Sequence, residues 1–73
     1  MSKLPQVSGR ECVKALQRIG FYVDHQTGSH VIMYRDDPPG RIPVPNHKTI
    51  KKGLLSKIIK DAGLTVDEFI QLL

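Results

Sequence analysis

Histidine is the residue type in this sequence that is best suited to proton transfer at neutral pH, and three are present: His25, His30 and His47. A neutral imidazole can take or give a proton, and activating a ribose 2′-hydroxyl towards its neighbouring phosphate needs such a group. His30 follows residues 27–29, whose central glycine favours a tight turn, and it begins a predicted strand. That position would hold the side chain rigidly while leaving it open to solvent. A histidine beside a turn is nevertheless more often an exposed polar residue than a catalyst, so position alone does not assign the role.

Cleavage of a phosphodiester bond also needs cations near the phosphate, because negative charge develops on its oxygens. Several arginines and lysines are candidates, and Tyr34 could stack on a base. Tyr22 and Tyr34 are equally consistent with an ordinary cross-strand aromatic pair. The residues that we expect to contact RNA around His30 are Ser29, Tyr34, Arg35, Arg41, His47, Lys51 and Lys52.

Metal chemistry and thiol chemistry both have weak support in the sequence. No two histidines have the spacing of metal ligands, and no carboxylate pair accompanies them. Cys12 is the only cysteine, so it cannot form an internal disulfide, and it falls on the apolar face of a predicted helix. Gly28 lacks the strand-to-helix context of a phosphate-binding loop. We therefore expect neither a metal nor another cofactor, and we expect Cys12 in the core.

The chain is basic, with eleven lysines and arginines against seven acidic residues, a formal charge of +4 and a pI near 9.5. An excess of positive charge favours a polyanionic partner, nucleic acid above all. Ordinary solubility explains a charge of this size equally well. Arg10, Lys14 and Arg18 recur every four residues, which predicts a basic stripe on one helix. A solvated helix face is the simpler interpretation of that stripe.

A chain of 73 residues with no linker and no internal repeat predicts one domain, residues 1–73. No apolar run approaches the length of a membrane span, and residues 1–5 lack the apolar core of a signal peptide. A single cysteine fits a reducing compartment. We therefore expect a soluble cytoplasmic protein that does not contact a membrane.

Two capping boxes indicate where helices begin, because in each a hydroxyl and a glutamate three residues later satisfy each other's backbone N–H groups. Ser8 with Glu11 predicts the first helix, and Thr65 with Glu68 predicts a short last one. Apolar residues at helical spacing over 54–62 predict a helix between them. Three strands are predicted at 21–26, 30–36 and 41–44, joined by turns at 27–29 and 37–40.

A three-residue loop at 27–29 would place Gln26 opposite His30 in a hairpin. Counting outwards, the further pairs are Asp24 with Ile32, Val23 with Met33, and Tyr22 with Tyr34. A slip of one residue would exchange the two faces of the sheet. The face predicted to carry the core has Phe21, Val23, Val31 and Met33. The opposite, open face has Tyr22, Asp24, His30, Ile32 and Tyr34.

The third strand belongs at the edge of the sheet, because Pro43 and Pro45 lack N–H groups on the same side. Ile42 and Val44 would face the core. Both main helices must bury their apolar stripes against the one apolar sheet face. The expected fold is a two-layer α+β sandwich of order α-β-β-β-α, with a three-stranded antiparallel sheet and a short C-terminal helix. Double-stranded-RNA-binding domains share this order, so a non-catalytic RNA-binding module is the alternative to an enzyme.

The sequence also resembles a known family along nearly its whole length. The most specific motifs are Gly28-Ser29-His30 before a strand, and Val44-Pro45 with His47 ahead of Lys52-Gly53 and a helix. Weaker matches around them are Lys3-Leu4-Pro5, Ser8-Gly9, Leu16, Gly20-Phe21, Ile50-Lys51, Leu55, Ile58, Ala62-Gly63-Leu64 and Phe69. The ordered set is similar to HicA, the messenger-RNA interferase toxin of bacterial and archaeal HicA–HicB modules.

This resemblance implies an α-β-β-β-α fold of the double-stranded-RNA-binding type and the role of toxin in a type II toxin–antitoxin system. It implies endoribonuclease cleavage of mRNA without a metal, with a single catalytic histidine, here His30. It also implies a monomer when free and neutralisation by a HicB antitoxin that covers the active face. Many members have a second histidine where this chain has Val31, and a threonine where it has Leu54.

Overall fold

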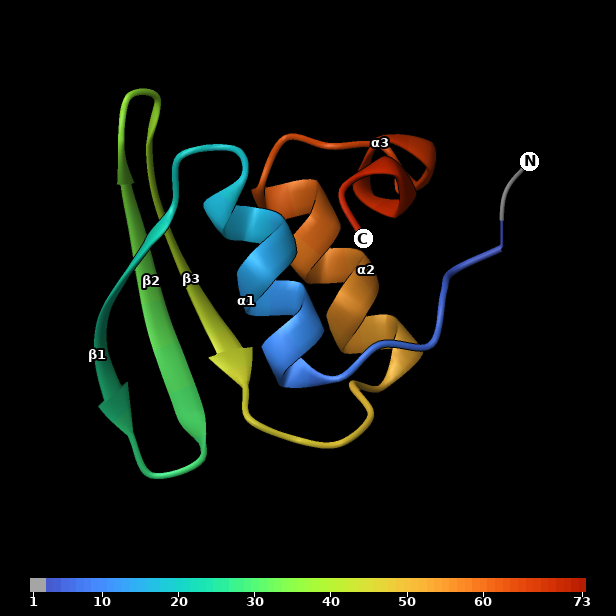
Figure 1. Cartoon of the computed structure of the whole chain (residues 1–73), viewed down its shortest axis with the longest axis horizontal. Coiled ribbons are helices and arrows are strands. Elements are labelled where there is room, and N and C mark those ends of the chain that lie inside the picture. Colours follow the sequence, from blue (N-terminus) through green and yellow to red (C-terminus); the bar gives the residue numbers. More distant parts are fainter. Residues whose placement is uncertain (1–2) are drawn as a thin grey trace.

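Three helices lie on one side of a three-stranded sheet in the computed structural model, which describes residues 3–73 (Figure 1). The elements are α1 (Gly9–Gln17), β1 (Tyr22–Thr27), β2 (His30–Asp36), β3 (Pro39–Pro45), α2 (Lys52–Asp61) and α3 (Val66–Gln71). This order confirms the predicted α+β sandwich with its short C-terminal helix. Met1 and Ser2, the first two residues of the predicted domain, lie outside the described range.

Both predicted capping boxes are present. The Ser8 hydroxyl accepts a hydrogen bond from the Glu11 N–H at 3.1 Å, and the Glu11 carboxylate accepts one from the Ser8 N–H at 2.9 Å. Thr65 and Glu68 make the same reciprocal pair at the start of α3. Each box satisfies two N–H groups that a helix start leaves without an intrahelical partner. The sequence therefore sets the starting points of α1 and α3 locally.

The core lies between the helical layer and one face of the sheet. α1 contributes Cys12, Ala15 and Leu16, all with no exposed surface. Ile42 and Val44 of β3 face the helices and are buried, as predicted. The largest fully buried side chains are Phe69, Leu16, Met33, Ile42, Leu55 and Val44.

The sheet has the order β1-β2-β3, with both hairpins antiparallel. This confirms β2 as the middle strand and β3, with its two prolines, as an edge strand. The predicted four-residue turn between them is wrong. Asp36 pairs with Pro39 and Arg35 pairs with Gly40, so only two residues, 37–38, form the turn. β3 therefore begins two residues earlier than its apolar pattern indicated.

The first hairpin differs from the predicted register near its turn. Gly28 and Ser29 alone form the loop, with Gly28 at φ +47°, and Thr27 pairs with His30. The predicted pairs of Gln26 with His30 and Asp24 with Ile32 are therefore wrong. A two-residue loop suits strands of right-handed twist when its first residue adopts positive φ, which glycine does readily.

Further from the turn, the predicted register is correct, with Tyr22 opposite Tyr34 and Val23 opposite Met33. The two registers differ by one residue, and the extra residue is absorbed in a β-bulge between Val23 and His25. A bulge changes the direction in which the neighbouring side chains point. It turns His25 opposite Ile32, and so onto the face that carries His30. A regular strand would have pointed His25 towards the helices.

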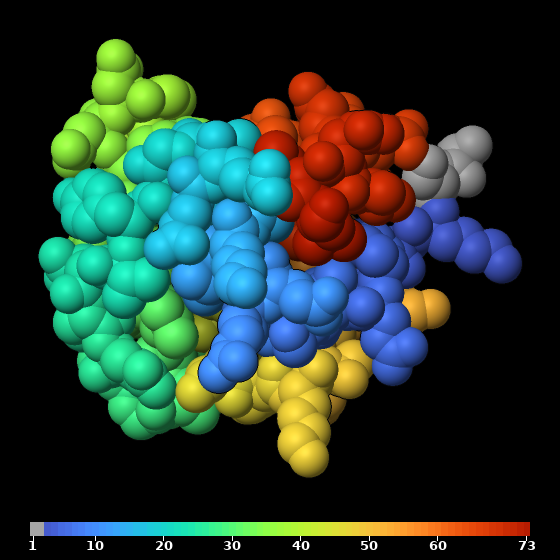
Figure 2. Space-filling view, in the orientation of Figure 1, coloured from blue at the N-terminus to red at the C-terminus, as the bar shows by residue number. Residues whose placement is uncertain are grey.

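Two residues lie on their predicted faces but differ in burial from what those faces imply. Val23 points to the helical side but is 45% exposed, because a groove of about 460 Å³ separates this part of β1 from α1 (Figure 2). Ile32 lies on the open face, opposite His25 and Pro43, yet is only 3% exposed. It is buried outside the main core cluster, which lies on the helical side. The open face thus has a small apolar centre of its own.

Candidate functional site on the open sheet face

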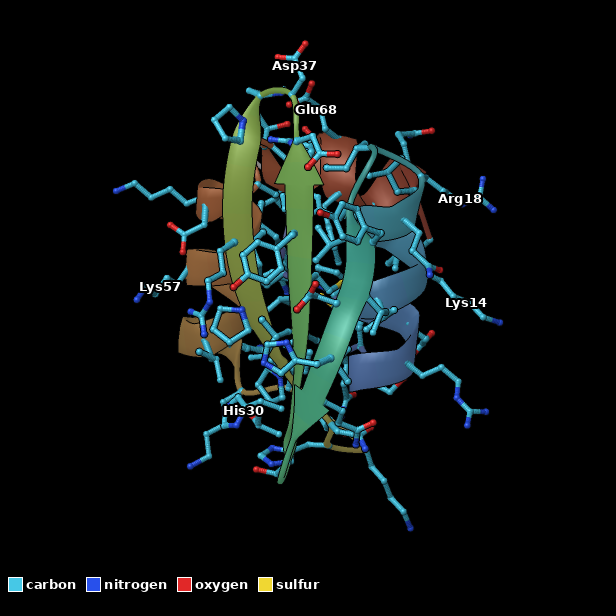
Figure 3. All side chains as sticks on the ribbon, turned by 90° about the vertical axis from the view of Figure 1, so that its left-hand side faces the viewer. Lys14, Arg18, His30, Asp37, Lys57 and Glu68 are labelled. Atoms are coloured by element: carbon cyan, nitrogen blue, oxygen red, sulfur yellow. The ribbon has the colours of Figure 1, made fainter. Side chains whose placement is uncertain are left out.

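The open face of the sheet carries His30 near the end where the first hairpin turns (Figure 3). His30 is the first residue of β2, and it pairs with Thr27 of β1 and Pro45 of β3. Its side chain is exposed. Because strands on both sides hold the backbone of this residue, the imidazole starts from a fixed point while its ring remains open to solvent.

The contacts of His30 distinguish its two ring nitrogens. Nδ1 lies 3.5 Å from the hydroxyl oxygen of Ser29, a long hydrogen bond. The carbonyl oxygen of Ser29 accepts a 2.6 Å hydrogen bond from the N–H of Asn46. Ser29 is therefore held by the segment after β3 while it faces the ring of His30. This arrangement leaves Nε2 as the nitrogen available for a substrate.

A second histidine shares this face because of the bulge. His25 Nδ1 lies 2.6 Å from Oδ2 of Asp24, and about half of each side chain is exposed (48% and 47%). The carboxylate accepts a hydrogen bond from Nδ1 and so directs Nε2 of His25 outwards. Neither Asp24 nor His25 was among the residues predicted from the sequence to act at this site. A regular strand places them on opposite faces, and the three-residue loop predicted from the sequence agrees with a regular strand. The bulge that brings them together therefore had no signal in the sequence.

Tyr22 and Tyr34 form a cross-strand pair on the same face. The Tyr22 hydroxyl donates a 3.2 Å hydrogen bond to Oδ1 of Asp36. Local desolvation, followed by the negative charge of Asp36 and this hydrogen bond, raises the pKa of Tyr22 above its usual value. Tyr22 therefore stays a neutral donor across the physiological range, and Tyr34 is left as the aromatic ring next to Arg41.

The two predicted RNA-contacting arginines lie on opposite faces. Arg41 stands opposite Tyr34, so it shares the open face with His30, and its side chain is exposed. Arg35 points to the helical side instead. Its guanidinium lies 4.4 Å from the ring centroid of Phe21 and donates hydrogen bonds to the carbonyl oxygens of Pro38 and Ile19. Arg35 thus closes one end of the core, and the structure does not bring it to His30.

The remaining predicted RNA-contacting residues follow β3. His47 is exposed, and its carbonyl oxygen accepts a 2.8 Å hydrogen bond from the N–H of Gly9. Lys51 and Lys52 stand at the start of α2 and line a hollow of about 420 Å³ with residues 4–6. The start of α2 belongs to the helical layer (Figure 1). The structure therefore does not gather these two lysines on the open face with Arg41.

The predicted basic stripe is present on α1. Arg10, Lys14 and Arg18 are all exposed, and Figure 3 shows Lys14 and Arg18 pointing away from the molecule. Arg10 and Lys14 also border the groove between α1 and β1, whose floor includes Val13 and Val31. The stripe lies on the helical layer rather than on the face of His30.

Cys12 does not contribute to a surface site. It is fully buried in α1, and burial raises the pKa of its thiol to about 12. A thiol with that pKa is protonated at neutral pH and is a poor nucleophile. Among residues 3–73, no group of three or more histidine, cysteine, aspartate or glutamate side chains is arranged to hold a metal ion.

Within the same described range, no helix combines the length and apolar composition needed to cross a membrane. No curated protein sequence matched the chain. Residues 9–64 match the family model described as the HicA toxin of bacterial toxin–antitoxin systems. The match includes the Gly28-Ser29-His30 motif, all three strands and α2. The chain therefore belongs to the HicA toxin family of bacterial toxin–antitoxin systems.

Proposed function

We propose that this toxin is an endoribonuclease that cleaves mRNA without a metal ion and uses His30 as its catalytic residue. The observation that carries the proposal is the placement of His30. It is exposed on the open sheet face, its Nδ1 faces Ser29, and its Nε2 is available to a substrate. Membership of a toxin family supports a destructive activity, and the basic charge of the chain supports a nucleic acid as target.

In the proposed reaction, Nε2 of His30 takes the proton of a ribose 2′-hydroxyl. The 2′-oxygen then bonds to the adjacent phosphorus, and the bond from phosphorus to the 5′-oxygen of the next nucleotide breaks. The 5′-oxygen takes up a proton as it leaves, and the products are a 2′,3′-cyclic phosphate and a 5′-hydroxyl end. Arg41 is the cation on this face that would stabilise the negative charge on the phosphate oxygens. Tyr34, beside it, offers a ring on which a base can stack.

The test is incubation of the purified chain with mRNA in the presence of EDTA, followed by gel analysis. Wild-type protein should shorten the RNA and His30→Ala should leave it intact. Lys57→Ala, an exposed change on α2 far from this face, should behave as wild type and so controls for handling of a variant. Circular dichroism should give all three proteins the same spectrum.

Two results would overturn parts of this proposal. Cleavage by His30→Ala at the wild-type rate would remove His30 from the catalytic role. Salt-dependent binding of RNA by wild type, with no shortening under any condition, would instead identify a non-catalytic RNA-binding module.

We further propose that the antitoxin of this system is of the HicB type and neutralises the toxin by covering the open face. A face with two tyrosines and two histidines offers aromatic contact surface to a protein. Hydrogen–deuterium exchange of the toxin with and without a HicB-type protein tests this. Protection of residues 22–36 is expected, whereas protection confined to α2 and α3 would place the antitoxin elsewhere.

A further inference from the structure

We propose that His25, oriented by Asp24, is the second proton-transfer group of this site and protonates the leaving 5′-oxygen. The inference rests on the proposed ribonuclease function. Transesterification removes a proton from the 2′-oxygen and must deliver one to the 5′-oxygen as its bond to phosphorus breaks. The attacking and leaving oxygens stand on opposite sides of the phosphorus in an in-line displacement. One imidazole that accepts the first proton is poorly placed to donate the second.

The bulge in β1 places a second imidazole at a suitable separation. His25 stands opposite Ile32, and His30 lies two residues before Ile32 on the same strand face. The two histidines are therefore diagonal neighbours across the hairpin, a relationship in which residues stand about 7–8 Å apart. Side chains that start from backbone positions at that separation can both reach a phosphate group placed between them. Ile32 is buried below them and forms an apolar floor.

Asp24 gives His25 the form that a general acid needs. Its Oδ2 lies 2.6 Å from His25 Nδ1, so the protonated ring keeps a counter-charge on one nitrogen while Nε2–H points outwards. A carboxylate in this position holds the ring orientation and stabilises the imidazolium, as in other histidine–carboxylate pairs. Among residues 3–73, Nδ1 of His30 has no carboxylate partner and faces the Ser29 hydroxyl. The two histidines thus have different surroundings, which favours different roles.

Other titratable groups face this pair from all three strands. They are Tyr22 on β1, Tyr34 on β2 and Arg41 on β3, with Asp36 bound to the Tyr22 hydroxyl. Tyr22 is kept neutral by its raised pKa, and an arginine keeps its charge at every accessible pH. These neighbours therefore do not compete with the two histidines as proton-transfer groups.

The decisive experiment uses a substrate that does not need a general acid. A cleavage site is first mapped with wild-type protein on a short RNA. The 5′-oxygen at that site is then replaced by sulfur, since a thiolate leaves without protonation. His25→Gln should cleave the all-oxygen RNA about 10²- to 10⁴-fold more slowly than wild type and should cleave the sulfur-containing RNA at nearly the wild-type rate. His30→Ala should remain inactive on both substrates.

The pH profile provides a second readout that a purely structural role would not change. The cleavage rate of wild type should follow a bell-shaped pH profile, with the acid limb due to His30 and the alkaline limb due to His25. The rate of His25→Gln should no longer fall at alkaline pH. Asp24→Asn should retain both limbs, with the alkaline fall beginning at lower pH because the imidazolium has lost its carboxylate. Asp24 is thus a positioning residue and His25 the catalytic one.

The outcomes separate this inference from the proposed function. If wild type is active and depends on His30, but His25→Gln keeps the wild-type rate and both pH limbs, the role of His25 is refuted while the proposed function stands. A slow His25→Gln variant that the sulfur substrate does not rescue would also refute the general-acid role. If wild type does not cleave RNA at all, the proposed function itself fails.

Discussion

The N–H of Asn46 donates a 2.6 Å hydrogen bond to the carbonyl oxygen of Ser29, and this bond ties the residue before His30 to the residue after β3. The same segment continues to α1, because the N–H of Gly9 donates a 2.8 Å hydrogen bond to the carbonyl oxygen of His47. The hairpin turn, the end of β3 and the start of α1 are therefore one connected unit. A change at the start of α1 should therefore affect the position of Ser29 and of His30 beside it.

Gly9→Ala should lower the free energy of unfolding by about 1–3 kcal/mol, as overpacking does elsewhere. A Cβ on Gly9 would overlap the carbonyl oxygen of Pro45, which is backbone and cannot move aside easily. Gly53→Ala is the matched control, because a Cβ there meets nothing within 4 Å. Its free energy of unfolding should be unchanged or raised by up to about 1 kcal/mol. Urea denaturation measures both, and equal stability of the two variants would contradict the close contact.

Arg35→Met should lower the stability of the fold, whereas Arg41→Met should lower RNA cleavage. Arg35 contacts the Phe21 ring and two carbonyl oxygens, so its loss should cost about 1–3 kcal/mol of unfolding free energy. Arg41 is exposed on the open face, so its loss should leave the unfolding free energy within about 0.5 kcal/mol of wild type. RNA cleavage by folded Arg41→Met should fall about tenfold or more, by loss of a cation at the phosphate. A destabilised Arg41→Met with full cleavage would contradict these roles.

Stability should fall as the pH rises above 9 because of Cys12. Its folded pKa of about 12 exceeds the ordinary value of 9.0, so between these values the unfolded chain loses a proton that the folded chain keeps. The contribution of the thiol to stability is complete below pH 9 and declines above it, with a slope of up to about 1.4 kcal/mol per pH unit. Urea denaturation at pH 8–10.5 should show a steeper decline for wild type than for Cys12→Ala. Parallel declines would mean that the thiol ionises equally well in the folded protein.

Ser8→Ala should cost about 1 kcal/mol of unfolding free energy, since it removes the acceptor for the Glu11 N–H at the start of α1. Ser56 is exposed in the middle of α2. Ser56→Ala should be neutral or slightly stabilising, because alanine favours the helix interior. Thermal unfolding of the pair distinguishes a cap from a general serine effect. Equal midpoints for the two variants would argue against the capping box.

The parts of the fold that depend on neighbouring residues could be predicted from sequence. Ser8 and Thr65 mark their helices through contacts three residues away. Pro43 and Pro45 identify an edge strand because proline has no backbone N–H to donate to a neighbouring strand. The burial of Ile42 followed from alternation along its strand. These features need no knowledge of distant packing. The Tyr22–Tyr34 pairing was counted from a three-residue loop, and it is correct because the bulge in β1 offsets the shorter loop.

The composition of the site could be predicted only in part, because the bulge at Asp24 results from two constraints acting together. The Gly28–Ser29 turn fixes one register and the pairing of Val23 with Met33 fixes another. The two registers are seen to disagree only when both the turn and the pairing are known. Arg35 shows the same limit, since its charge suggested a phosphate contact but the ring of Phe21 and two carbonyl oxygens hold it on the helical side.

The measurement that tests the central claim most directly is the chemistry of the cut RNA end. Wild type and His30→Ala are incubated with the same RNA in EDTA, and the new 3′ ends are identified by mass spectrometry. Catalysis by His30 without a metal predicts 2′,3′-cyclic phosphate ends from wild type and no cleavage products from His30→Ala. Products with 3′-hydroxyl ends, or cyclic phosphate ends formed equally by His30→Ala, would contradict it.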